Sequence, residues 1–460
     1  MQDLTTERSA SPISVPARPK VGVLLAAGRA ERLHHITRGH SKVLLRLGGM
    51  SLWERAVRTL LAHGMERVVV VVGFDARSVT DAVDRMGDPR VEVVTAEGWE
   101  EGNGASLAAA AGAVDGEESF VLLCADHLFG VGVLEGLMQA GAPAVLVDDS
   151  PTPEAWDEGT RVRIHGGRAL VFRKSLTDPA IDCGAFVLTP DVFECQASAS
   201  AHGDHTLAGA VSGLAERRPM VVTPLPHGAW WQDVDVPEDL RRARSLLRRD
   251  LTKESDGPVS RFLNRPISTR LSFGLSPLRI PPNVLSLFAF VVGLIAAGFL
   301  AAERGLVGGL LVQASSVFDG MDGETARLQF RTTARGARLD DMLDRMVDAA
   351  VVAGMGLWAI EDSFRPSMAA LIAAIACGWA LFHWIVSRKT VALALEPRAE
   401  KSLGFLLGSR DGRLLLVAAG GLLGRPLLGV LAMATGYVVS VAARAFLVRR
   451  TVGARALAVR

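Results

Sequence analysis

The chain has 460 residues, of which 49% are hydrophobic and 22% charged, and its formal net charge at pH 7 is +1. This balance excludes a protein that binds a polyanion through an overall basic charge, so we expect no nucleic-acid partner. The mean hydropathy of +0.27 is high for a soluble protein. Because apolar runs concentrate after Pro282, we expect a soluble part followed by a membrane part.

Residues 1–20 mix Ser, Thr, Pro and charges without an apolar stretch, which predicts a disordered tail and not a signal peptide. The four cysteines form no CxxC spacing, so we expect reduced core residues in a cytosolic setting. They are Cys124, Cys183, Cys195 and Cys377.

A soluble domain is expected over residues 21–250. Its short apolar runs, rich in β-branched residues, predict buried strands at 21–27, 68–72, 91–95 and 120–124. A helical pattern at 52–63 separates the first two. Alternating strands and helices favour a doubly wound α/β sheet, with its ligand at the carboxyl ends of the strands. The turn at 28–32 is then the expected phosphate site.

This turn has the composition of a nucleotide site. The small residues Ala26, Ala27 and Gly28 let a nucleotide lie against the backbone, while Arg32 and Lys42 have the charge to hold its phosphates. An ordinary βα turn with surface cations is the alternative for this segment alone. Three further polar segments follow in order, which are GNGASL at 102–107, ADH at 125–127 and WQDVDVPED at 231–239.

Together these segments resemble the sugar-phosphate nucleotidylyltransferases over residues 21–245. The resemblance implies that Lys42 binds phosphate and that Asp126 and Asp233 hold a Mg²⁺ ion. It also places three residues near the nucleotide base, which are Asn103, Gly104 and Ser106. Ala30 stands where the family's loop has its second glycine, which puts the fine geometry of the loop in doubt.

Two residues of this domain keep two interpretations, and a third has one. Asp235 either shares the metal or is an acid at a helix N-terminus before Pro237. Lys174 either grips the substrate phosphate or is a solvated surface lysine. Asp182, in a segment that resembles the family's substrate-binding strand, is expected to accept hydroxyls of a sugar or polyol.

A linker is expected over residues 251–282, after a helical segment at 240–249 that ends the soluble domain. Residues 253–258 form a polar break. Three arginines then alternate with apolar residues, which favours an amphipathic helix on the anionic cytosolic leaflet over a plain surface helix. They are Arg261, Arg265 and Arg270, interleaved with Phe262, Leu263, Ile267 and Leu271.

Six transmembrane helices are expected over residues 283–450, at 284–302, 306–318, 346–360, 367–386, 414–423 and 427–447. If both ends of the membrane part lie in the cytoplasm, the cytoplasmic loops contain most of the basic residues. The loops on the other side contain only Arg304, Arg365 and Arg425. The cytoplasmic set is Arg331, Arg335, Arg338, Arg388, Lys389, Arg398, Lys401, Arg410 and Arg413, with Arg449 and Arg450 after the last span. This asymmetry predicts a multi-pass protein of the cell (inner) membrane with its soluble domain in the cytoplasm.

An acidic motif follows the second span. Asp319 and Asp322 are three residues apart, and Asp340 and Asp344 four apart, so each pair lies on one face of its own helix. Two such helices packed together form an oxygen-only site for Mg²⁺ or Mn²⁺. Solvated helix ends are the alternative.

The spacing D-x2-D-G-x2-A-R-x8-G-x3-D-x3-D resembles the CDP-alcohol phosphatidyltransferase family, whose fold is an all-α six-helix transmembrane domain. The resemblance implies that Asp319, Asp322 and Asp340 bind metal and that Asp344 both binds metal and acts as general base. It places four residues in the CDP pocket, which are Gly323, Ala326, Arg327 and Gly336. Three basic residues have two interpretations: they bind the phosphate of a charged acceptor, or they only set the membrane topology. They are Arg388, Lys389 and Lys401.

The whole chain, with a final tail at 451–460, resembles a family of bifunctional enzymes with inositol-1-phosphate cytidylyltransferase and di-inositol-phosphate phosphate synthase activities. The resemblance implies CTP and inositol 1-phosphate as substrates, CDP-inositol as the intermediate, contact with membrane lipids and a homodimer. One alternative is a phospholipid synthase whose soluble half activates another phospho-alcohol. Another is a membrane-tethered nucleotide-binding protein without turnover.

Overall fold

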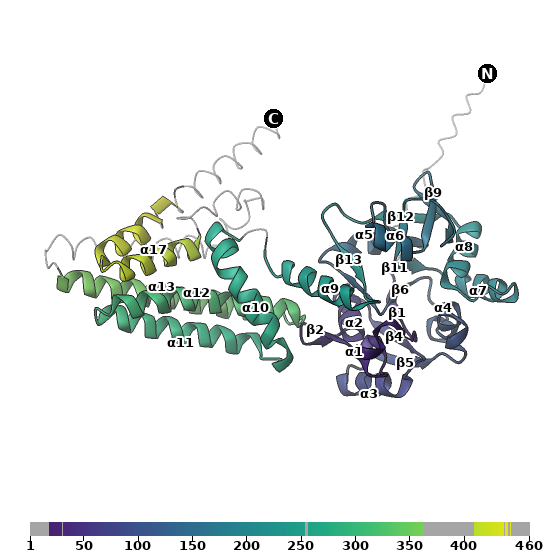
Figure 1. Cartoon of the computed structure of the whole chain (residues 1–460), viewed down its shortest axis with the longest axis horizontal. Helices are drawn as coiled ribbons and strands as arrows, with labels where there is room; N and C mark the ends of the chain where they lie inside the picture. Colours follow the sequence, from purple (N-terminus) through teal and green to yellow (C-terminus); the bar gives the residue numbers. More distant parts are fainter. Residues whose placement is uncertain are drawn as a thin grey trace, which may run out of the picture. The chain divides into compact units, whose positions relative to one another are not determined.

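The computed structural model describes residues 18–29, 31–253, 256–362, 409–436, 438–439 and 442. The chain divides into two compact units, Met1–Leu246 and Leu247–Arg460 (Figure 1). Several predictions fall outside the described residues. They are the tail before residue 18, the replacement at Ala30, Cys377, the span at 367–386, the end of the last span at 443–447, the final tail, and the basic residues Arg388, Lys389 and Lys401.

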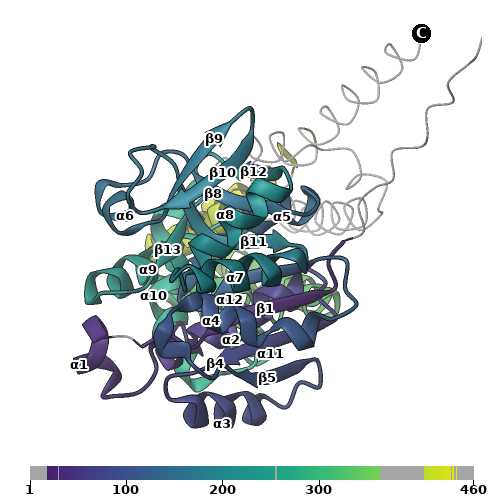
Figure 2. The same cartoon turned by 90° about the vertical axis from the view of Figure 1, so that its right-hand side faces the viewer.

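The first unit is built on a nine-stranded mixed sheet with the order β5-β4-β1-β6-β11-β8-β12-β10-β9. Figure 2 looks onto this unit, with β5 and β9 at opposite ends of the sheet. The strands are β1 (Val21–Ala26), β4 (Arg67–Val72), β5 (Val91–Thr95), β6 (Phe120–Cys124), β8 (Ala144–Asp148), β9 (Arg161–His165), β10 (Arg168–Arg173), β11 (Ile181–Leu188) and β12 (Met220–Pro224).

The predicted parallel strands β1, β4, β5 and β6 pair in parallel. The sheet then departs from a purely parallel one, because β11 runs antiparallel to both β6 and β8. Two short ladders lie outside it, β2 (Arg46–Leu47) with β3 (Met50–Ser51) and β7 (His127–Phe129) with β13 (Trp231–Asp233).

Helices cover both faces of the sheet. They are α1 (His34–Thr37), α2 (Leu52–Ala62), α3 (Ala76–Met86), α4 (Asn103–Ala109), α5 (Val133–Gln139), α6 (Pro153–Glu158), α7 (Asp191–Ala201), α8 (Leu207–Arg217) and α9 (Pro237–Arg249). Successive residues of β1 point to opposite faces, so Val23 belongs to one hydrophobic core with Leu107, and Leu24 belongs to the other with Trp53. This is why the central strands are apolar throughout.

Strand register brings distant segments together at one edge. Leu25 of β1 pairs with Cys124 of β6, so the turn after β1 lies beside the segment that begins at Ala125. His127 of β7 pairs with Asp233 of β13. Three segments that are far apart in sequence therefore meet at the carboxyl ends of the central strands.

The described helices of the second unit are a π-helical turn (Ser260–Asn264), α10 (Arg265–Leu275), α11 (Pro282–Ala301), α12 (Gly305–Leu328), α13 (Ala334–Asp362) and α17 (Arg410–Leu422). Their core joins residues of α11, α12, α13 and α17, including Leu300, Val312, Val351 and Val417. Among the described residues, α11 alone has the length and apolar composition that a membrane crossing requires, with a mean hydropathy of 2.6, and 426–436 is a shorter apolar helix.

The helices differ from the predicted spans in three ways. The acidic motif lies on helices as predicted, but these helices, α12 and α13, run for 24 and 29 residues and so extend beyond the predicted spans at 306–318 and 346–360. Arg335 and Arg338 lie on α13 and Arg410 on α17, so they are helical and not loop residues.

The third difference concerns the predicted amphipathic helix. Phe262 and Ile267 are exposed as expected. Arg265, predicted to face the leaflet with the other arginines, instead points inward and pairs with Asp256 and Glu324.

Candidate active sites

The first candidate site lies at the carboxyl edge of the nine-stranded sheet. Asp126 follows β6, Asp233 ends β13, and Asp235 stands two residues later. One carboxylate oxygen from each of the three lies within 4.8 Å of the others. Like charges this close repel one another strongly unless a cation lies among them.

Lys42 supplies part of that positive charge. Its Nζ lies 2.6 Å from Asp126 Oδ2 and also pairs with Asp235, although only 7% of the residue is exposed. Burial disfavours its charge, but the three carboxylates raise the pKa of Lys42 above its usual range. For Asp126, burial is outweighed by Lys42 and His127, which lower the pKa of this carboxyl to about 2.

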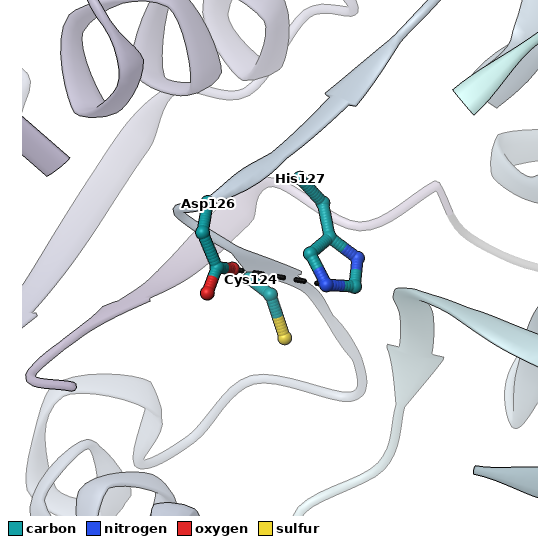
Figure 3. Close-up of side chains that lie close together, drawn as sticks. All are labelled: Cys124, Asp126 and His127. Atoms are coloured by element: carbon teal, nitrogen blue, oxygen red, sulfur yellow. Dashed lines mark ion pairs between the residues drawn. The ribbon is translucent and has the colours of Figure 1, made fainter. Parts of the chain in front are cut away.

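His127 also faces the carboxylates. Its Nδ1 donates to the Cys183 carbonyl at 2.7 Å, and its Nε2 lies 3.5 Å from Asp233 Oδ2 and 3.8 Å from Asp126 Oδ1. Figure 3 shows the imidazole beside Asp126, with the pair marked by a dashed line. Burial opposes the charge on His127, but Asp233 and Asp126 raise the pKa of the imidazole to about 10.

These residues fit a divalent cation. Asp233 Oδ1 is buried and has no hydrogen-bond partner within the described part of the chain, and a buried carboxylate oxygen is costly when left unpaired. The donors on the cluster are carboxylate oxygens, which Mg²⁺ and Mn²⁺ prefer. The structure also brings Asp235 into the cluster, so it is more than an acid at a helix start.

Two cavities adjoin the carboxylates and share Asn103, Cys124 and Asp126. One has a volume of about 610 Å³, and its lining includes Ala27, Gly28 and Ser106. The other has a volume of about 680 Å³, and its lining includes Arg32, Lys174, Asp182, Asp233 and Asp235. The predicted nucleotide residues thus line mainly the first cavity, and the predicted substrate residues line the second.

Four predicted residues make contacts within the protein itself. Ala26 is buried in the sheet core, and Gly104 donates its backbone N–H to the His205 carbonyl at 2.8 Å. Neither lines these two cavities. Asn103 accepts from the Leu207 backbone at 2.7 Å and so holds the start of α8. Arg32 lines the second cavity but pairs with Asp235 at 2.7 Å and with Glu158.

The second candidate site lies between α12 and α13. Carboxylate oxygens of Asp319, Asp340 and Asp344 lie within 4.8 Å of one another. Asp322 is 7% exposed, accepts a hydrogen bond from Ser286 and interacts with Asp340. The two helices therefore bring Asp319, Asp340 and Asp344 to a common centre, with Asp322 in contact with Asp340, and this oxygen-only set fits a divalent cation.

Arg410 enters this cluster from α17. Its Nη1 lies 3.0 Å from Asp319 Oδ2 and 2.8 Å from Asp344 Oδ1, while its Nε donates to Asp348 Oδ1 at 3.0 Å. One guanidinium offsets only one of these negative charges, which leaves the site strongly acidic. The sequence prediction treated Arg410 only as a topology signal and did not consider Asp348.

The predicted CDP-pocket residues lie around the same helix faces. A Cβ at Gly323 would meet only the Arg327 side chain, at 3.3 Å, and a Cβ at Gly336 would meet Thr333 at 3.0 Å. Ala326 is buried. Arg327 donates to the Leu251 carbonyl at 2.6 Å, and its buried Nε has no hydrogen-bond partner among the described residues. That N–H is a donor suited to an anionic ligand.

Glu324 connects the motif helix to α10. Its side chain is fully buried and accepts from Ser268 at 2.5 Å, Ser272 at 2.7 Å and Arg265 at 2.7 Å. Arg265 in turn pairs with Asp256 at 2.8 Å. The carboxylate is therefore fully satisfied, and the network fixes α10 against the part of α12 that carries the acidic motif.

Sequence reasoning overlooked Asp348, Arg410, Glu324 and the partners of His127. A signal existed for Asp348, because it continues the four-residue spacing of Asp340 and Asp344. For the others, a contact across the fold decides the role, and spacing along the chain does not reveal it.

Two family models match the chain. Residues 22–181 match the MobA-like NTP transferase domain, and residues 279–442 match the CDP-alcohol phosphatidyltransferase family. The first match covers β1 and β6, and the second covers the four carboxylates of α12 and α13.

Relatives match over nearly the whole chain. A protein of Rubrobacter xylanophilus named "Bifunctional IPC transferase and DIPP synthase" is 37% identical, over 90% of this chain and 92% of its own length. Proteins with the same name from Aquifex aeolicus and Thermococcus kodakarensis are each 32% identical. The Aquifex match covers 90% of this chain and 95% of the relative, and the Thermococcus match covers 86% and 89%.

Proposed function

Because this chain belongs to the family of bifunctional IPC transferases and DIPP synthases, we propose that each of its two carboxylate clusters carries out one of two consecutive reactions. The enzyme transfers a cytidylyl group from CTP to inositol 1-phosphate, which gives CDP-inositol and pyrophosphate. It then transfers phosphoinositol from CDP-inositol to a second inositol 1-phosphate, which releases CMP and gives di-inositol phosphate phosphate.

The first reaction is assigned to the cluster at the sheet edge. A phosphate oxygen of inositol 1-phosphate attacks the α-phosphorus of CTP in line, and pyrophosphate leaves. CTP occupies the cavity beside Gly28 and Ser106, and inositol 1-phosphate occupies the cavity beside Lys174 and Asp182. Asp126 borders both cavities, which supports its proposed role as a cation ligand between the two reacting phosphates.

The second reaction is assigned to the cluster between α12 and α13. Asp344 takes the proton from the attacking inositol hydroxyl, and Arg410 holds its carboxylate toward Asp319. Arg327, whose buried Nε has no hydrogen-bond partner in the part of the chain that the structure describes, binds a phosphate of CDP-inositol. The convergence of Asp319, Asp340 and Asp344 on one centre is the observation that carries this assignment.

Both clusters fit Mg²⁺, with Mn²⁺ as the alternative. The ligands are Asp126 and Asp233, with Asp235 beside them, in one site and Asp319, Asp322, Asp340 and Asp344 in the other. When bound, such an ion neutralises charge on the reacting phosphates and on the leaving group.

We further propose a multi-pass inner-membrane protein with six transmembrane helices, in contact with membrane lipids, with both sites cytoplasmic and a homodimer as the assembly. The CDP-alcohol phosphatidyltransferase match and the apolar helix α11 support the membrane location. The exposed side chains of Phe262, just before α10, and of Ile267, on α10, support contact with a leaflet surface.

Asp344→Asn tests the assignment of the base. The variant should form CDP-inositol from CTP at the wild-type rate and lose CMP release from supplied CDP-inositol. Asp341→Asn, an exposed acid on the same helix, should change neither rate appreciably. Persistent CMP release by Asp344→Asn would remove this residue from the role of base.

A further inference from the structure

The cluster at the sheet edge offers a second set of donors besides its carboxylates. The side chains of Cys124, Asp126 and His127 point into one space (Figure 3), and their ligand atoms lie within 4.8 Å of one another. Cys124 ends β6 and lines both cavities, so a solute that enters either cavity reaches its thiol.

The imidazole is held as a ligand would be. Nδ1 of His127 donates to the Cys183 carbonyl at 2.7 Å, which leaves Nε2 directed toward Asp126 and Asp233. Metal-binding histidines usually donate their other ring N–H to a carbonyl or carboxylate, which fixes the ring orientation. The Trp231 ring, with its centroid 5.4 Å from that of His127, limits ring rotation further.

Gly184 leaves the room that this arrangement needs. A Cβ at this position would collide with His127 Nδ1 and approach Cys124 Sγ to 3.2 Å. The backbone φ of +68° also disfavours any other residue. The glycine therefore allows the thiol and the imidazole to share one side of Asp126.

We propose that Cys124, Asp126 and His127 form a site for a thiophilic divalent cation such as Zn²⁺. Thiolate, imidazole and carboxylate are the donors of zinc sites, whereas Mg²⁺ takes oxygen donors and leaves sulfur aside. Because Asp126 is common to both donor sets, Zn²⁺ and Mg²⁺ exclude each other. The mutual exclusion of Zn²⁺ and Mg²⁺ rests on the proposed function of this site in cytidylyl transfer. The binding of Zn²⁺ is independent of that proposed function.

Binding releases a proton from the thiol. Zn²⁺ is coordinated by a thiolate, so the Cys124 proton passes to solvent as the sulfur–metal bond forms. A proton on Nε2 of His127 leaves in the same way. Two protons at most are therefore exchanged for one doubly charged ion.

Co²⁺ is the probe for the binding step, because a thiolate ligand gives it a charge-transfer absorption in the near ultraviolet. Titration of the full-length protein without nucleotide should produce this band, and an equivalent of Zn²⁺ should abolish it. Cys124→Ser should lose the band, while Cys195→Ser, a buried thiol on α7, should keep it. A wild-type protein without the band, or a Cys124→Ser variant that keeps it, overturns the proposal.

Competition is measured separately, in the cytidylyl-transfer reaction at fixed Mg²⁺. Zn²⁺ should inhibit the wild-type enzyme, and the concentration for half inhibition should rise more than about 100-fold in Cys124→Ser, beyond what loss of an outer-shell partner costs. Equal inhibition of both proteins overturns the exclusion. An inactive Mg²⁺ enzyme that still gives the Co²⁺ band would instead count against the proposed function.

Discussion

Lys42 is charged in a buried position because three carboxylates surround it. Sequence reasoning assigned it to phosphate binding, but in the structure it bridges Asp126 and Asp235. A lysine in this position orients the metal ligands as well as offering charge to a phosphate. Both effects stabilise the charge on the cytidylyl group as it is transferred.

Lys42→Met should therefore reduce kcat for cytidylyl transfer by about 100- to 1,000-fold, the range for loss of one fixed charge partner at a reacting centre. The matched control is Lys20→Met. Lys20 pairs with Glu66 across an exposed surface, where both side chains are more than 60% exposed, so this change should have little effect. Equal losses in the two variants, measured as pyrophosphate release, would contradict the role of Lys42.

His127 makes stability depend on pH. Its pKa in the folded protein is raised to about 10, above the value of about 6.5 for an unfolded chain. The interaction therefore stabilises the folded protein fully below about pH 6.5 and is lost as the pH rises through about 10. With divalent ions chelated, the melting temperature should fall over this window.

His127→Gln should remove that part of the pH dependence, whereas His165→Gln, an exposed histidine on β9, should retain it. The measurement is thermal unfolding between pH 6 and pH 10, with each variant compared with the wild-type protein at the same pH. The same slope in all three proteins would be incompatible with a charged His127.

Among the helices of the second unit, one buried acid of α12 accepts three side-chain hydrogen bonds from α10. Glu324 accepts three hydrogen bonds, from Arg265, Ser268 and Ser272, and has no exposure to solvent. Removing one partner of a buried ion pair leaves the other without compensation. The position of the acidic motif therefore depends on Glu324, which lies outside the cluster of Asp319, Asp340 and Asp344.

Glu324→Gln should destabilise the second unit by about 3–5 kcal/mol and slow CMP release more than cytidylyl transfer. Arg270→Gln, on the exposed face of α10, is the control and should change neither. Thermal unfolding in detergent and the two separate rates are the measurements. A Glu324→Gln variant with wild-type stability would show that α10 is held by other contacts.

The central strands and α11 could be predicted because their patterns are local. Apolar runs gave β1, β4, β5 and β6 within a residue or two, and the uncharged run after Pro282 gave α11. The antiparallel β11 and the pairing of β7 with β13 depend on contacts between distant segments. Arg265 and Arg410 were read as surface charges because a sequence does not show which arginines have a buried acid opposite them.

At the scale of the whole molecule, the first reaction supplies the donor that the second consumes. The two carboxylate clusters lie in separate units of the chain. A substitution in one cluster is therefore expected to abolish one reaction and to leave the other unchanged.

Asp126→Asn should lose CDP-inositol formation, whereas Asp344→Asn should lose only CMP release. Membranes that contain both variants should make the final product from CTP and inositol 1-phosphate, because CDP-inositol diffuses from one protein to the other. Membranes with either variant alone should not. As a control, supplied CDP-inositol should restore synthesis of the final product by Asp126→Asn. If this control succeeds but the mixed membranes make no final product, the intermediate does not leave the protein.

One chain makes CDP-inositol and uses it to build a water-soluble phosphodiester. The most direct measurement is phosphorus NMR of the aqueous and lipid fractions after membranes that contain the protein are incubated with CTP, inositol 1-phosphate and Mg²⁺. We predict pyrophosphate, CMP and di-inositol phosphate phosphate in the aqueous fraction, with no new phosphorus signal in the lipid. A new inositol phospholipid, or CDP-inositol that accumulates without CMP, would contradict the account.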